Sequence, residues 1–196
     1  MKARAPLVAL PFLALAACGG GESVRAKEAE VQRQAAVLTG WERMFGSPET
    51  TIASANQFGF RAPALEGTVG AYKTQGSEIF ISSTAVAAPN KASFAATGVN
   101  ADALDAISFT LLLQDPTNEA PAKQRFSTVI RDFLFQAKAP GAEAIAAAVT
   151  AGRPARGTIP GADWALTRSM QEGVPVATRL TVTFTRPDTK SATSSS

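Results

Sequence analysis

The alternation of apolar and polar positions is clearest in the second half of the chain. Within residues 106–114 the apolar side chains occupy every second position: Ile107, Phe109, Leu111 and Leu113. A period of two is that of a strand with one buried face, so a strand is predicted here. Leu112 falls on the second face, which indicates that part of that face is covered as well.

The next segment has the period of a helix. Its apolar residues recur at three- and four-residue intervals: Phe126, Val129, Ile130, Phe133, Leu134 and Ala137. This spacing gives one apolar helical face and predicts a helix over residues 118–138, with Thr117 or Asn118 as its cap. A second helix is predicted over residues 142–151, ended by Gly152 and Pro154.

Alternation returns near the C-terminus and predicts a hairpin over residues 163–186, with Glu172-Gly173 at its turn. The apolar positions are Trp164, Leu166 and Met170 in the first strand, and Val174, Val176, Leu180, Val182 and Phe184 in the second. The opposite face of the second strand carries Arg179, Thr181, Thr183 and Thr185. That face should therefore meet water, as in a sheet covered by helices on one side.

The first half of the chain has weaker patterns. Residues 25–38 are rich in helix formers and predict an N-terminal helix. Glycine and proline make residues 46–66 look irregular. Short strand patterns at residues 68–74 and 78–84 flank Gln75-Gly76-Ser77 and predict a hairpin, while residues 85–99 stay unassigned apart from a turn at Pro89-Asn90.

This order of elements predicts a single α+β domain over residues 26–186. The expected architecture is an antiparallel sheet with helices packed on one face, a two-layer sandwich. Residues 187–196 are rich in serine and threonine and are expected to be disordered.

The first residues have the three parts of an export signal. Lys2 and Arg4 give a basic start, residues 5–15 are apolar, and small residues lead to Cys18, the one cysteine of the chain. A bilayer-spanning helix needs roughly 20 apolar residues, so this run is too short, and Pro11 interrupts it. Residues 1–17 are therefore interpreted as a signal peptide that is removed.

The end of this segment, Leu15-Ala16-Ala17-Cys18, resembles the lipobox of bacterial lipoproteins. The resemblance implies that the thiol of Cys18 carries diacylglycerol, that the chain is cut before it, and that the new amino group is often acylated. The alternatives are an ordinary secretory signal or an N-terminal core segment. The resemblance stops at the lipobox and indicates no family for the folded domain.

The lipobox interpretation also predicts where the protein is held. Two or three acyl chains make detachment negligible, whereas a single myristoyl chain binds only reversibly. Residues 18–25 then form a flexible tether. Gly19 stands where inner-membrane lipoproteins of this type usually have Asp, which implies the outer membrane, facing the periplasm, in a Gram-negative cell.

Charge and composition exclude several function classes. Removal of Lys2 and Arg4 with the signal lowers the basic side chains from 19 to 17 against 16 acidic ones, a net charge of +1. These charges are scattered, so a nucleic-acid partner is excluded. Histidine is absent, which excludes Ser-His-Asp and Cys-His catalysis and His-liganded zinc. With Cys18 lipidated and no phosphate-binding loop present, neither a metal nor a cofactor is expected.

Carboxylates are the remaining catalytic candidates. Asp102, Asp105 and Asp115, with Glu119 beyond, could form the paired acid and base of a cell-wall glycan hydrolase. The simpler interpretation is that Asp102 caps a turn and Asp115 ends a strand. A third alternative is a lipid or apolar-ligand carrier, in which Phe126, Phe133 and Leu134 would border a cavity.

Arginines are the candidate contacts for an anion or a partner. Arg153 and Arg156 lie in a predicted proline-stiffened loop over residues 152–161, and a guanidinium pairs carboxylate or phosphate in a planar fork. Arg168 beside Arg179 and its threonines could dock a partner. Each set could instead be hydrated surface.

Trp41 and Phe45 are a further candidate, either as an exposed aromatic anchor or as part of the core. With no catalytic motif evident, the preferred hypothesis is a membrane-anchored, non-enzymatic accessory protein that binds an envelope protein or a cell-wall component.

Replacement of Cys18 by serine tests the anchor. Because a hydroxyl cannot form the thioether, Cys18→Ser is expected to abolish incorporation of labelled fatty acid and to release the protein from membranes. A wild-type chain that takes up no label and stays in the soluble fraction would show that the lipoprotein interpretation is wrong.

Overall fold

The computed structural model describes residues 39–82, 86–172 and 176–187. The predicted signal peptide, Cys18, the tether, the helix over residues 25–38 and residues 188–196 of the predicted tail lie outside the described residues. The statements below concern the described ranges only.

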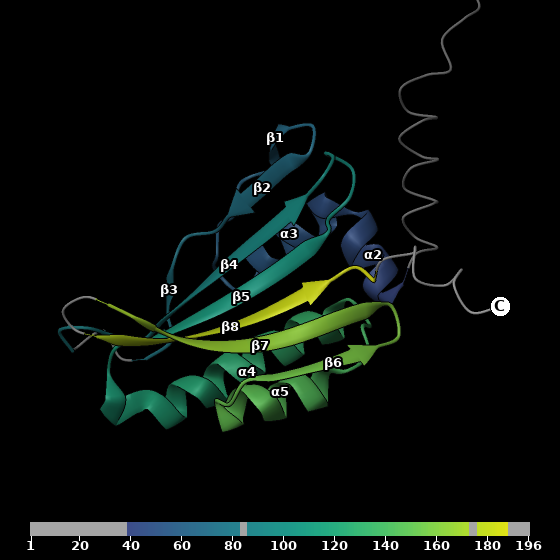
Figure 1. The fold of residues 1–196 in the computed structure, drawn as a ribbon. Coiled ribbons are helices and arrows are strands. Elements are labelled where there is room, and N and C mark those ends of the chain that lie inside the picture. Colours follow the sequence, from purple (N-terminus) through teal and green to yellow (C-terminus); the bar gives the residue numbers. More distant parts are fainter. Residues whose placement is uncertain (1–38, 83–85, 173–175, 188–196) are drawn as a thin grey trace, which may run out of the picture.

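Eight antiparallel strands form one sheet in the order β1-β2-β4-β5-β8-β7-β6, with β3 paired to β4 (Figure 1). The strands are β1 (Glu66–Thr68), β2 (Ala71–Gln75), β3 (Ile79–Phe80), β4 (Lys91–Gly98), β5 (Ala106–Leu113), β6 (Ala155–Ile159), β7 (Ala162–Gln171) and β8 (Ala177–Thr185). The helices are α2 (Gly40–Gly46), α3 (Pro48–Asn56), α4 (Glu119–Gln136) and α5 (Ala142–Ala151), with a short 3-10 turn, η1 (Pro116–Asn118), before α4.

The helices lie behind the sheet in the view of Figure 1. On α4, the ring of Phe133 is 4.9 Å from that of Phe109 on β5, and on α2 the ring of Trp41 is 4.9 Å from that of Phe184 on β8. The antiparallel sheet, the mixed α+β class and the single domain predicted from the sequence are confirmed, and these contacts are compatible with helices packed on one face.

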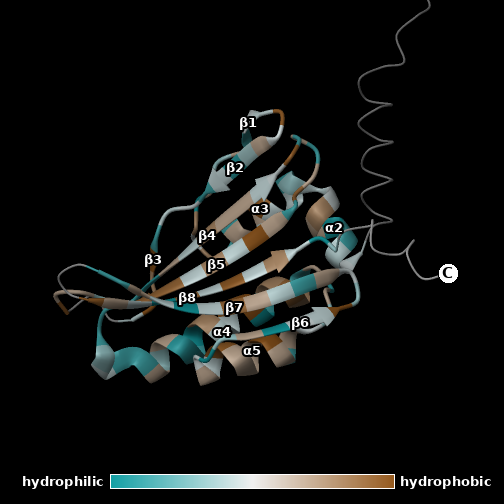
Figure 2. Ribbon diagram, in the orientation of Figure 1, coloured by the Kyte–Doolittle hydropathy of each residue, from teal (hydrophilic) through white to brown (hydrophobic). Residues whose placement is uncertain are grey.

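The core lies between the sheet and the helices. Ile107, Phe109 and Leu111 of β5 are fully buried, and hydrophobic residues alternate with paler ones along the central strands in Figure 2. Phe94 of β4 and Phe60 lie with their ring centroids 5.3 and 5.7 Å from that of Phe109. A strand period of two therefore delivers aromatic rings to one face, where they pack edge to face.

Several elements form where the sequence pattern places them. Strand β5 spans Ala106–Leu113, α4 spans Glu119–Gln136 and α5 spans Ala142–Ala151. Gly152 ends α5 with a φ of 65° and donates its N–H to the carbonyls of Ala148 and Val149. A left-handed residue after the last turn is the usual helix stop that glycine permits.

The C-terminal hairpin is also present, as β7 and β8. Trp164, Leu166 and Leu180 are buried as expected, but Met170 and Val176 are 63% and 61% exposed. All residues from Thr167 to Gln171 are exposed, so the predicted alternation of buried and exposed positions is lost in this half of β7.

The prediction that residues 46–66 are irregular is wrong for the first half of this range. Helix α3 (Pro48–Asn56) follows α2 almost directly, and Pro48 occupies its first position. Proline is favoured there because its missing N–H has no partner inside the helix. The Thr51 hydroxyl donates to the Met44 carbonyl at 2.7 Å and joins the two helices. Residues 60–65 lie outside helices and strands, as predicted.

The predicted hairpin of residues 68–74 and 78–84 is also wrong. Strand β2 pairs with β1 and with β4, while β3 pairs with β4. The N–H of Gly76 donates to the carbonyl of Phe94 at 2.8 Å. The chain therefore continues along β4 at this glycine instead of reversing.

Strands β4 and β6 were not predicted from the sequence pattern. The unassigned residues 85–99 contain β4, a central strand whose buried positions include the small residues Ala92 and Ala96. The predicted loop over residues 152–161 contains the edge strand β6. Gly157 is needed in β6 because a Cβ there would lie 2.8 Å from the indole nitrogen of Trp164.

The buried amide of Asn90 holds the start of β4 against the end of β5. Its Oδ1 accepts the N–H groups of Gln114 and Asp115, both at 2.8 Å. Its Nδ2 donates to the carbonyls of Asp115 and Asn118 at 3.2 and 3.3 Å. Every hydrogen-bonding position of this fully buried side chain is therefore used.

Replacement of Asn90 by alanine is expected to lower the free energy of unfolding by about 3 kcal/mol, because several buried backbone groups lose their partners. Urea unfolding followed by circular dichroism measures the change. The matched control is Asn100→Ala, since Asn100 is exposed and accepts a single N–H, that of Asp102. Equal effects of the two substitutions would contradict the assigned role of Asn90.

Candidate functional site

The sheet face opposite the aromatic core carries small and hydroxyl side chains and is called the open face here. Across β4, β5, β8 and β7, the register aligns Ser93, Thr110, Thr181 and Thr167 in one row. Hydroxyl groups meet between strands: those of Thr110 and Thr181 lie 3.1 Å apart, and those of Ser108 and Thr183 lie 3.2 Å apart. The open face is therefore an ordered array of donors and acceptors.

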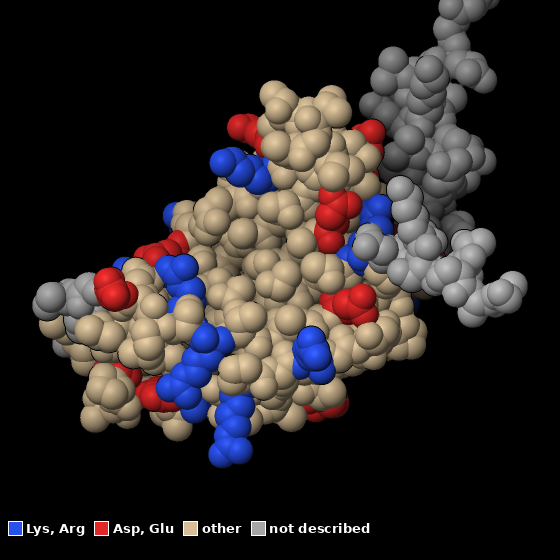
Figure 3. Space-filling model, viewed as in Figure 1, with Lys and Arg blue, Asp and Glu red and all other residues tan. Residues whose placement is uncertain are grey.

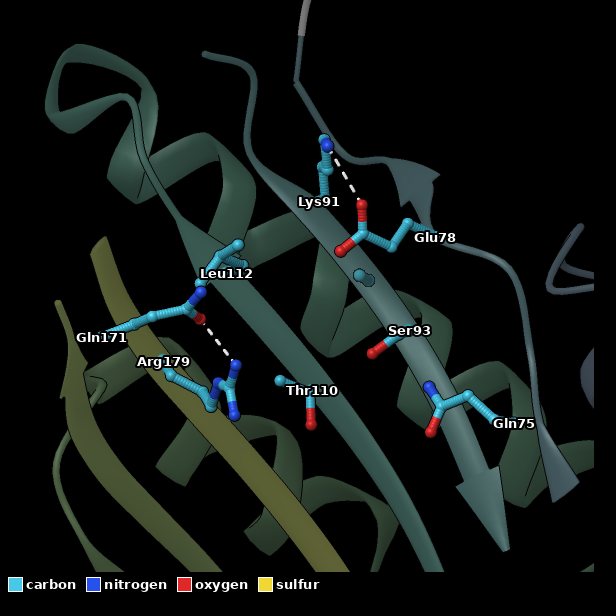
Figure 4. A pocket seen from close by; sticks show the side chains of 9 residues that line it. Gln75, Glu78, Lys91, Ser93, Thr110, Leu112, Gln171 and Arg179 are labelled. Atoms are coloured by element: carbon cyan, nitrogen blue, oxygen red, sulfur yellow. Dashed lines mark hydrogen bonds and ion pairs between the residues drawn. The ribbon is translucent and has the colours of Figure 1, made fainter. Parts of the chain in front are cut away.

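A second row lies nearer one end of the open face and contains Lys91, Leu112 and Arg179. At a strand spacing of about 4.8 Å, the Cα atoms of Lys91 and Arg179 are about 10 Å apart. A hollow of about 320 Å³ opens at this row (Figure 4). It is called the Arg179 hollow and is lined by Gln75, Glu78, Lys91, Ala92, Ser93, Thr110, Leu112, Gln171 and Arg179.

The two cations of the Arg179 hollow have different surroundings. The Lys91 ammonium lies 3.0 Å from the Glu78 carboxylate and 5.9 Å from the ring centroid of Phe80. The Arg179 guanidinium donates to Oε1 of Gln171, a neutral amide oxygen. Counting Glu78 against the two cations leaves the hollow with a net charge of +1.

Charged side chains surround the middle of this face and leave its centre free of them in Figure 3. At the other end of the open face, a shallower hollow of about 550 Å³ is lined in part by Arg156, Thr158 and Asp163. The Thr158 hydroxyl donates to the Asp163 carboxylate at 2.6 Å. The Asp163 carboxylate of this second hollow is therefore already hydrogen-bonded to another residue that lines it.

The predicted arginines do not form one cluster. Arg168 is aligned with Leu180, a buried residue, so it lies on the opposite sheet face from Arg179 and the expected row of these two is wrong. Arg156 is aligned with Ala165 of β7 and lies on the open face, at the second hollow. Arg153 is exposed between α5 and β6.

Arg179 is instead brought together with Lys91, Glu78 and Gln171, none of which the sequence pattern singled out. Lys91 belongs to the unassigned segment, and Gln171 is the last residue of the exposed end of β7. The sequence contained one indication of this site, Leu112, the apolar residue on the second face of β5. It lies half-buried and lines the hollow.

Comparisons with protein-family models, curated proteins and solved structures find no match. The chemistry of the site is therefore inferred from its own side chains.

Asp115 lies far from the other two candidate carboxylates, Asp102 and Asp105. Asp105 accepts the N–H of Val99 at 2.7 Å and, with Asp102, lies just before β5. Asp115 follows the other end of β5, about 30 Å away at roughly 3.3 Å per residue. Glycoside cleavage requires two carboxyl groups within about 10 Å, so Asp115 cannot pair with either of the other two. Within the described ranges, no three potential metal ligands group together.

Asp115 has a structural role at the start of η1. Its carboxylate accepts hydrogen bonds from the Thr117 hydroxyl and N–H and from the Asn118 amide. These bonds, the Thr117 hydroxyl first and the Asn118 amide second, lower the pKa of Asp115 below its usual range. A carboxyl held ionised in this way serves as a cap and is unsuited to act as a general acid.

The aromatic candidates belong to the core. Trp41 and Phe45 are each 2% exposed, and the Trp41 indole N–H donates to the Pro140 carbonyl at 3.3 Å. Phe126 and Leu134 of α4 are fully buried. Phe133 borders a space of only about 50 Å³, which is too small for a lipid chain.

The lowered pKa of Asp115 predicts a pH dependence of stability. Ionised Asp115 contributes stability that is fully present above the ordinary aspartate pKa and is lost as the pH falls through the lowered one. The difference in unfolding free energy between wild type and Asp115→Asn should therefore stay constant down to about pH 5 and shrink below about pH 4. Urea unfolding at each pH measures it.

Thr117→Val is the companion variant, because it removes the hydroxyl that lowers the pKa of Asp115 most. Carbon NMR of the Asp115 carboxyl should show the pKa rising towards its ordinary value in this variant. A wild-type carboxyl that titrates above the ordinary aspartate range would contradict the assignment.

Proposed function

We propose that the protein is a lipid-anchored component of the bacterial cell envelope that acts as a binding module and docks its partner on the open face. Anchorage through Cys18, in the outer membrane and facing the periplasm where the cell is Gram-negative, is part of this proposal and is supported by the lipobox-like Leu15-Ala16-Ala17-Cys18. In the part of the chain that the structure describes, no helix has the length and apolarity needed to cross a bilayer.

The observation that carries the proposal is the ordered hydroxyl array of the open face. Hydroxyl groups both donate and accept hydrogen bonds, and here the sheet register fixes their spacing over four strands. A polar partner therefore meets a preorganised surface, which lowers the entropy cost of association. A hollow at each end of the array adds shape to a surface that the helices leave uncovered.

The two alternative functions have less support. A glycan hydrolase that uses Asp115 with Asp102 or Asp105 fails on their separation. A carrier with its cavity at Phe126, Phe133 and Leu134 fails on the filled packing of that helix face. The open face offers a surface for recognition and requires neither arrangement.

Site-directed photocrosslinking in intact cells tests the proposal. A benzophenone amino acid replaces Thr167, an exposed residue of the open face. The matched control replaces Arg131, an exposed residue of α4. Thr167 is expected to give one dominant adduct, which migrates above the free protein or sediments with the cell wall, and Arg131 is expected to give none.

The pattern of adducts separates the outcomes. No adduct at Thr167 means that the open face only meets water and overturns the proposal. Equal adducts at both positions would show contact without a preferred surface and would count against it equally. Circular dichroism of both variants verifies that the domain is folded.

A further inference from the structure

We propose that the Arg179 hollow binds a small ligand that carries one carboxylate group with polar groups beside it. This inference rests on the proposed function, because it names the chemistry that one end of the open face recognises.

Arg179 supplies the group that would hold the carboxylate. Its side chain lines the hollow from β8 and donates from Nη2 to the Gln171 amide oxygen (Figure 4). Among the described residues, no carboxylate lies within ion-pair distance of this guanidinium. A guanidinium has five N–H donors, so enough remain for the planar two-bond fork that carboxylates accept.

The net charge of the hollow selects a monoanion. Lys91 and Glu78 form an ion pair at one side, so the charge left over is that of Arg179. A carboxylate compensates this single charge. A phosphate monoester carries about −1.5 to −2 at pH 7, which exceeds it and brings the extra charge towards Glu78.

The rest of the hollow suits the body of a small polar molecule. Thr110 places a hydroxyl group beside Arg179, Ser93 adds one farther along the hollow on β4, and Leu112 provides an apolar patch between the two cations. Gln75 and Gln171 add amide groups at the rim. The volume of about 320 Å³ lies at the lower end of the range for ligand sites, roughly 300–1,000 Å³.

The place of the hollow indicates where the ligand comes from. The described chain begins at Thr39, beside α2, which packs against the Phe184 end of β8. Arg179 lies near the other end of β8, about 20 Å from Thr185 at roughly 3.3 Å per residue. The chain that leads back to Cys18 thus leaves the described domain at the end remote from the hollow, which favours a ligand other than the headgroups of the anchoring bilayer.

The test uses the purified full chain in detergent micelles, with backbone amide signals followed by NMR. N-acetylglycine and glucuronate are the carboxylate probes, and N-acetylglycinamide and methyl glucoside are their uncharged counterparts. Inorganic phosphate, and phosphatidylglycerol incorporated into the micelles, test the other anions. We expect both carboxylates to shift the signals of Thr110 and Leu112, and the other probes to leave those signals unchanged.

Three variants test which side chains determine the affinity for the carboxylate. Arg179→Gln should weaken carboxylate binding tenfold or more, because a charge-assisted fork is lost. Glu78→Gln should strengthen binding, because it removes the opposing charge and frees Lys91. Arg153→Gln, which removes an arginine outside the hollow, should bind as wild type does.

Each contrary result overturns the inference. Equal shifts from the uncharged counterparts, tighter binding of phosphate or phosphatidylglycerol, or unchanged binding by Arg179→Gln would each exclude a carboxylate fork at this site. If the carboxylates do not bind but Thr167 still gives its crosslinked adduct, this inference fails and the docking proposal stands. If the carboxylates bind but Thr167 gives no adduct, the docking proposal fails.

Discussion

The alignment of the open face depends on one buried side chain, the amide of Asn90. Its four hydrogen bonds tie the residue just before β4 to Gln114 and Asp115, which follow β5, and to Asn118 at the start of α4. Lys91 follows directly in the chain and is thereby fixed opposite Leu112, which is itself aligned with Arg179. An unmet amide or backbone group at this depth would be costly, so strand register, helix start and hollow geometry are held by the same set of bonds.

The two faces of the sheet carry different kinds of side chain. The buried face carries aromatic rings at alternate positions, and their packing with α2 and α4 supplies the apolar burial that stabilises the domain. The other face is then free to carry hydroxyl groups in register. Those groups satisfy one another between β5 and β8, so the exposed array remains ordered.

The sequence was most informative where burial and period coincide. Strand β5 and helices α4 and α5 combine large apolar residues with a clean repeat, and their extents follow from it. Strand β4 was missed because alanines fill two of its buried positions. Strand β6 was missed because Gly157, which packs against Trp164, is a residue typical of loops. The Arg179 hollow could not be predicted: Lys91 and Arg179 are distant in sequence and meet only through the order β4-β5-β8. Arg168 and Arg179 separate because the β7–β8 register aligns Arg168 with Leu180.

The beginning of the described chain and the Arg179 hollow lie at opposite ends of the strands, and this arrangement has a mechanical consequence. A pull between Thr39, where the described chain begins beside α2, and a ligand held by Arg179 would be directed roughly lengthwise along β8. Hydrogen bonds between antiparallel strands are perpendicular to that direction, so all the bonds from β8 to β5 and β7 would share the load instead of opening one after another. The strand arrangement would therefore resist a force that draws these two ends of the domain apart.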